Sequence, residues 1–184
     1  MLRIDCSLFA LKSAHSSRLL PKLHIGVDAH GQIVASTVTE SHKQDPSQVP
    51  ALLIQVDRVI ARFIGDGMYD KAPVYTAVAQ HSPGVWGILP PRNDAGLSPT
   101  ASTASTPRDQ HLLAIERRGR CAWKRTSGYD MQSHAENAFA RCKWTFGGRL
   151  RAKREASQER EASLACQLLN RMRALGRPQS SPVR

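Results

Sequence analysis

The stretch GYDMQSHAENAFARCKW, residues 128–144, is the most informative part of this chain. It holds no proline and no glycine after its first residue, and its alanine content predicts a helix. At about 100° per residue, Gln132, Glu136 and Lys143 fall on one face, with Tyr129 within roughly 60° of them. An amide, a carboxylate and an ammonium on one face are unusual for a core. Taken alone, such a face is more often solvated surface.

The charge of the chain favours a polyanionic partner. Its 184 residues carry 26 Lys and Arg against 15 Asp and Glu, which gives a formal net charge of +11. A chain of this length predicts one domain. Nucleic acid is the simplest partner for it, because counterion release drives binding to phosphate backbones. A merely soluble basic protein is the alternative.

Two further features bear on the compartment. The four cysteines form no CxxC pair and have no zinc-type spacing to histidine, so we expect free thiols in a reducing compartment. No run approaches a membrane span, and residues 1–20 lack the continuous apolar core of a signal peptide. We therefore expect a cytoplasmic protein with no membrane contact.

Strand and helix patterns alternate along the chain and then give way to helices. The turn DAHG at residues 28–31 joins two apolar alternations into a hairpin. Ser47 and Asp70 are placed to cap helices, and the Ala/Ser/Thr/Pro-rich residues 93–107 predict a loop or a disordered insertion. The order predicts an α/β sheet flanked by helices. Strands are expected at residues 1–7, 22–28, 32–39, 59–64 and 85–89, and helices at 47–56, 71–80, 109–118, 128–144 and 155–175.

Asp66 is the first candidate for chemistry. It follows the strand expected at residues 59–64 and lies between Gly65 and Gly67. Ligands collect at the carboxyl ends of strands in α/β sheets, and the glycines let the backbone bend and a substrate approach. A simple turn residue is the alternative, since GDG is common turn chemistry.

Several separated motifs resemble the DDE transposases of bacterial insertion sequences. Within that family they resemble the branch whose last acid lies in the signature Tyr-x2-Arg-x3-Glu-x6-Lys. The motifs occur in the right order and spacing over roughly residues 21–176. They are PKLHIGVDAHGQIVA (21–35), SQVPALL (47–53), GDGMYDKAPVY (65–75), ILPPR (88–92), the stretch 128–144 and LLNRM (168–172).

The resemblance implies an α/β fold of the ribonuclease H type, with a mixed sheet flanked by helices. In that fold two aspartates and a glutamate hold two Mg²⁺ ions, and carboxylate oxygens suit this cation. Asp66 would be the second acid and Glu136 the third. Asp5, in IDCS, is the only candidate in place for the first, although it lies closer to the hairpin than expected. The catalytic core would span residues 22–176, after an atypical or remnant segment 1–21 and before a disordered tail 177–184.

The resemblance also implies contacts with DNA, both the ends of the insertion sequence and the target. Lys143 would contact a phosphate from the face of Glu136, and Tyr129 would help place the helix. Gln132 replaces the arginine of the signature, which removes a fixed charge and a bidentate phosphate donor. Basic side chains after the helix would add nonspecific binding, with a solvated face as the alternative; they are Arg149, Arg151, Lys153 and Arg154.

The expected function is therefore cleavage and transfer of DNA strands by two-metal chemistry. Relatives carry a region before the first acid that recognises the transposon end, whereas this chain begins almost at that acid. We expect a truncated or decayed transposase, in which activity is an open question. The alternative is a non-catalytic basic DNA-binding remnant, or an inhibitor of an intact transposase. A homo-oligomer is compatible with either interpretation.

Overall fold

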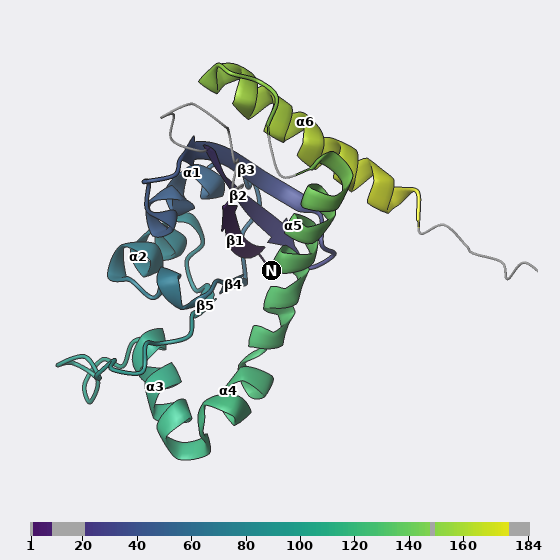
Figure 1. Cartoon of the computed structure of the whole chain (residues 1–184). Coiled ribbons are helices and arrows are strands. Elements are labelled where there is room, and N and C mark those ends of the chain that lie inside the picture. Colours follow the sequence, from purple (N-terminus) through teal and green to yellow (C-terminus); the bar gives the residue numbers. More distant parts are fainter. Residues whose placement is uncertain (1, 9–20, 148–149, 177–184) are drawn as a thin grey trace, which may run out of the picture.

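A computed structural model of the chain shows one sheet with helices on both of its faces (Figure 1). It describes residues 2–8, 21–147 and 150–176, and for 2–8 and 131 only the backbone. Within these residues, five strands form a sheet in the order β3-β2-β1-β4-β5. The α/β class expected from the sequence is confirmed. The strands are β1 (Leu2–Leu8), β2 (Pro21–Asp28), β3 (Ile33–Glu40), β4 (Arg62–Ile64) and β5 (Trp86–Ile88).

The sheet is mixed. β1, β2 and β3 pair antiparallel, which confirms the predicted hairpin, whereas β1, β4 and β5 pair parallel. The carboxyl ends of these three parallel strands therefore meet at one edge, which we call the carboxyl edge. The start of β2 lies there too, because Lys22 pairs with Leu8. The β2–β3 turn lies at the opposite edge, since Asp28 pairs with Leu2.

Apolar side chains bury both faces of the sheet. On one face, α1 (Val49–Leu53) and α2 (Ala72–His81) cover a cluster that includes Leu52, Phe63 and Val78. On the other, α5 (Ser133–Phe146) and α6 (Glu155–Ala174) cover the alternating Leu23, Ile25 and Val27 of β2. Full burial of such a side chain contributes about 1.5–3 kcal/mol to folding. Beside them, α3 (Pro107–Arg118) and α4 (Arg120–Ser127) pack Trp123 against Ile64 and Ile88.

The helix predicted over residues 128–144 is interrupted. Gly128 takes a left-handed conformation, with φ 82°, and ends α4, which the sequence analysis did not predict. Such a C-terminal glycine stops a helix without steric cost. Residues Tyr129–Gln132 then form a short 3-10 helix, η3, before α5 begins. The predicted helix is therefore not continuous from residue 128 to residue 144, and α5 begins only at Ser133.

Both predicted N-caps are wrong. Ser47 lies inside a 3-10 helix, η1 (Asp45–Gln48), and donates its hydroxyl to the carbonyl of Gln44 at 2.6 Å. Lys71, rather than Asp70, is the N-cap of α2. The Asp70 carboxylate instead accepts a hydrogen bond from Nε of Arg108, 38 residues further along the chain. The cap pattern is local, so it could not reveal these competing partners.

Several element boundaries also differ. β4 begins at Arg62, and the expected first residues of that strand lie in a loop with Val59 exposed. On α6, Ala162 and Leu169 are buried as expected, but Leu164, Leu168 and Met172 are exposed. The reason is that Cys166, between them, turns toward the sheet. The loop expected at residues 93–107 is present up to Thr106, where α3 is capped.

The remaining findings concern the cysteines and the membrane. Cys121, Cys142 and Cys166 are free thiols. No helix in the described part of the chain is long and apolar enough to cross a membrane. The predictions for residues 9–20, for Arg149 and for the tail 177–184 lie outside the described residues.

Candidate functional site

The pairing of β1 with β4 ends two residues before Asp5 and Asp66. In this parallel pair, Arg3 is the partner of Ile64, and each acid lies two residues further along the chain. β4 ends at Ile64, and the backbone at Asp66 is extended, with φ −73° and ψ 176°. Neighbouring strands are about 4.8 Å apart, so the two positions would adjoin at the carboxyl edge where the register continues past Ile64.

Asp66 is held in a tight turn. Its Oδ1 accepts a hydrogen bond of 2.7 Å from the backbone N–H of Met68 and so caps a 3-10 helix, η2 (Gly67–Tyr69). Gly65 is required by packing, because an added Cβ would lie 2.9 Å from Cδ2 of Leu89. A carboxylate has about four lone-pair sites. The backbone hydrogen bonds from Met68 and Tyr69 therefore leave Asp66 capacity for a further ligand.

The surroundings of Asp66 disfavour its negative charge. Burial raises the pKa of the Asp66 carboxyl, and the Asp45 carboxylate raises it further, while the hydrogen bond from Met68 lowers it. Desolvation and a nearby like charge both destabilise a carboxylate. A bound cation would relieve both effects, and shifted carboxyls of this kind are frequent at functional sites.

Glu136 lies on an exposed flank of α5. α5 packs Ala135, Ala138 and Phe139 onto the sheet and crosses β1 and β2. Arg141 extends from its other flank, where it donates a hydrogen bond of 3.3 Å to the carbonyl of Gly31 in the β2–β3 turn. Glu136 is roughly 140° around the helix from Arg141, and it is exposed. It therefore lies on the flank of α5 opposite the one that contacts the β2–β3 turn.

A buried ion pair that the sequence analysis did not predict lies near Asp66. Lys22 of β2 pairs with Asp45 of η1, and both side chains are buried. On the same strand, His24 is also buried, and its Nε2 is hydrogen-bonded to Oγ1 of Thr39 at 2.8 Å. Burial lowers the pKa of His24 to about 4. The only signal in the sequence was that polar residues alternate with the apolar ones of β2.

The donor chemistry of the predicted acids fits a hard divalent cation. Asp66 and Glu136 offer carboxylate oxygens, the ligand type that Mg²⁺ prefers. Among the side chains that the structure describes, no three His, Cys, Asp or Glu residues cluster closely enough to hold a metal ion. The third predicted ligand, Asp5, belongs to β1, for which only the backbone is described. Asp5 therefore stays a predicted ligand.

The predicted DNA contacts have different environments. Lys143 is exposed and shares a face of α5 with Glu136, about 20° apart. Tyr129 is half-buried, with its ring centroid 5.9 Å from that of Trp123. Gln132 is buried at the start of α5, so its amide is not presented to solvent. Arg151 is exposed, and its backbone N–H donates to Glu161 at 2.8 Å.

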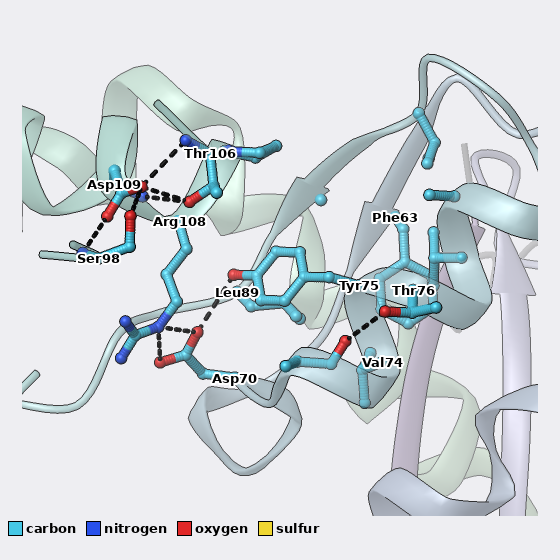
Figure 2. Close-up of a pocket in the computed structure, with 16 residues that line it drawn as sticks. Phe63, Asp70, Val74, Tyr75, Thr76, Leu89, Ser98, Thr106, Arg108 and Asp109 are labelled. Atoms are coloured by element: carbon cyan, nitrogen blue, oxygen red, sulfur yellow. Dashed lines mark hydrogen bonds and ion pairs between the residues drawn. The ribbon is translucent and has the colours of Figure 1, made fainter. Parts of the chain in front are cut away.

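A cavity of about 640 Å³ lies between α2, β5 and the start of α3 (Figure 2). Neither Asp66 nor Glu136 lines it. The Asp70 carboxylate accepts hydrogen bonds from Nε of Arg108 at 3.1 Å and from the hydroxyl of Tyr75 at 3.2 Å. Asp109 accepts hydrogen bonds from Thr106 and Ser98. The charged and polar groups that line the cavity thus pair with one another and join α2 to α3.

One comparison with known proteins bears on this chain. A family model described as a transposase DDE domain matches residues 12–171. The match includes Asp66, Glu136 and the whole of α5, and it begins after Asp5. It covers well over half of the sequence. The chain therefore belongs to the family of transposase DDE domains.

Proposed function

We propose that this chain cuts DNA strands at the ends of an insertion sequence and joins them to a target. Membership of the family implies a DNA partner, and DDE domains generally use divalent metal ions. The net charge of +11 favours binding to a phosphate backbone. The sheet, with β1 (Leu2–Leu8) as its central strand and helices on both faces, is compatible with a ribonuclease H-like core.

The observation that carries the proposal is the register of β1 and β4. It supports a site in which Asp5 and Asp66 would lie side by side at the carboxyl edge, and Glu136 would reach that site from the flank of α5 opposite Arg141. These three carboxylates would hold the metal ions. When bound, two such ions activate the attacking oxygen and stabilise the leaving oxygen of a phosphodiester.

The protein itself would orient the acids and the DNA. The cap onto Met68 holds the Asp66 carboxylate in one rotamer. The Lys22–Asp45 pair joins β2 to η1 beside it. Lys143, exposed on the face of Glu136, would attract the DNA backbone toward the acids. Arg151 would add a weaker, sequence-independent contact.

A nicking assay on supercoiled plasmid in Mg²⁺ tests this proposal. Asp66→Ala and Glu136→Ala should reduce nicking to the level without metal. Asp57→Ala is the matched control, because Asp57 is exposed and adjoins Arg58, whose partner Asp28 lies at the opposite edge of the sheet. Nicking that persists in both acid variants would refute the assignment.

The alternative is a non-catalytic DNA-binding remnant, or an inhibitor that pairs with an intact transposase. The buried Gln132 favours it, because this residue stands where the signature has an arginine, and so supplies no cation beside Glu136. The same assay separates the two. DNA binding without Mg²⁺-dependent nicking by the unaltered protein supports the alternative.

A further inference from the structure

A shallow groove lies directly beside Asp66 at the carboxyl edge. Its volume is about 520 Å³. It is built where β4 and β5 end, because Gly67 follows Asp66 and residues 90–91 follow β5. An added Cβ on Gly67 would lie 3.2 Å from the carbonyl oxygen of Pro90, so the two segments pack closely. The lining residues are Gly67, Pro90, Pro91, Arg92, Asn93, Asp94 and Arg120.

Arg120 is fixed at one side of this groove. It begins α4, and its Nη1 donates a hydrogen bond of 2.8 Å to the carbonyl of Pro91. One turn later, the buried Trp123 donates its indole N–H to Nδ1 of His111 at 3.1 Å. Nε2 of His111 in turn bonds the carbonyl of Gly87 at 2.6 Å. Because an indole only donates, His111 is neutral with its proton on Nε2, and the chain of bonds anchors α4 to β5.

Arg92 supplies a second guanidinium that can change partners. Its Nε and Nη2 donate to the Asp94 carboxylate at 3.0 and 3.1 Å, and the two side chains are 73% and 71% exposed. An ion pair this exposed contributes little to stability. Arg92 can therefore exchange the carboxylate for another anion at small cost. Asp94 both competes for Arg92 and repels an incoming anion.

We propose that this groove binds a DNA backbone phosphate adjacent to the one that is cut, with Arg92 and Arg120 as its donors. A guanidinium matches a phosphate through two parallel N–H bonds. The position of the groove, one residue past Asp66, places such a phosphate next to the predicted metal ligands. The inference rests on the proposed function only for the identity of the neighbouring phosphate.

The first test removes the competing carboxylate. Binding of a short DNA duplex is measured by fluorescence anisotropy in EDTA, so that metal chemistry does not contribute. Asp94→Asn should bind at least about threefold more tightly than Asp57→Asn, because it frees Arg92 and removes local repulsion. Both changes raise the net charge equally, and both side chains are exposed. Equal affinities of the two variants would overturn the proposal.

The second test removes a donor. Arg92→Ala should reduce the slope of log K against log salt concentration by about one, as expected for one lost phosphate contact. Arg160→Ala, an exposed cation on α6, is the control and should change the slope less. The same slope for both alanine variants would contradict a phosphate site in the groove. These exposed changes leave the packing of α4 intact.

The outcomes distinguish the two proposals. If the unaltered protein does not nick DNA but Asp94→Asn binds more tightly than its control, the groove assignment holds and the cleavage assignment fails. If the protein nicks DNA but the groove variants match their controls, the groove assignment is wrong and cleavage stands.

Discussion

Arg3 of β1 pairs with Ile64 of β4, and Asp5 and Asp66 each follow that pair by two residues along the chain. A buried carboxylate beside a like charge is destabilised unless a cation lies close to it. Burial and the nearby Asp45 already raise the pKa of Asp66. The carboxyl edge is therefore costly for the metal-free protein, a common trade of stability for function.

Replacing Asp66 by asparagine should not destabilise the metal-free protein. Asparagine keeps the cap on Met68, since it caps helices as well as aspartate, and it removes a disfavoured charge. We expect the free energy of unfolding in urea, in EDTA at pH 7.5, to stay equal or rise by up to about 1 kcal/mol. A decrease in the free energy of unfolding by more than about 1 kcal/mol would show that the protein accommodates the charge of Asp66 well.

Acid should destabilise the protein through His24. Its folded pKa of about 4 lies below the ordinary value of 6.5, so the unfolded chain binds more protons between these values. Stability is then full above about pH 6.5 and declines by up to about 3 kcal/mol as the pH falls toward 4. Urea unfolding across this range measures it. His24→Gln should lose most of this pH dependence, and an unchanged slope in that variant would exclude His24 as its source.

The hydrogen bond from Trp123 to His111 should be measurable in stability. Trp123→Phe keeps the ring in the core but leaves Nδ1 of the buried His111 without its donor. An unsatisfied buried group costs about 1–3 kcal/mol. The control is Trp144→Phe, at a side chain 93% exposed, with an expected change within about 0.5 kcal/mol. Equal changes in the unfolding free energy would contradict the anchoring role.

The ion pair of the larger cavity gives a contrasting prediction. Asp70 is 1% exposed and Arg108 is 31% exposed, so Arg108→Ala strands a buried carboxylate (Figure 2). Removing one partner of a buried pair costs about 3–5 kcal/mol. The double variant Asp70→Asn, Arg108→Met should be less destabilised than Arg108→Ala alone. Thermal and urea unfolding of the two variants and the unaltered protein measure this, and a double variant at least as destabilised as Arg108→Ala would refute the pairing.

Short periodic patterns in the sequence were enough to predict some of the strands and one candidate acid. The alternation of Leu23, Ile25 and Val27 predicted β2 and the hairpin, and both are present. The position of Asp66 after an apolar strand, between two glycines, marked it as a candidate for chemistry. The same patterns failed at Gly128, which adopts a left-handed conformation and ends α4.

The missed features all join residues far apart in the sequence. Lys22 pairs with Asp45 across the start of the sheet, and Asp70 with Arg108 across 38 residues. No local pattern predicts which of several cations a given acid will contact. The groove beside Asp66 was missed for the same reason, since Arg120 contacts Pro91, 29 residues earlier in the chain.

Binding of Mn²⁺, followed by electron paramagnetic resonance, tests most directly whether Asp5, Asp66 and Glu136 form one metal site. Mn²⁺ takes oxygen ligands as Mg²⁺ does. Asp5→Asn, Asp66→Asn and Glu136→Gln should each lose the tight binding of the unaltered protein, while Asp57→Asn should retain it. Tight binding that survives in any of the three acid variants, or its absence from the unaltered protein, would contradict the shared site.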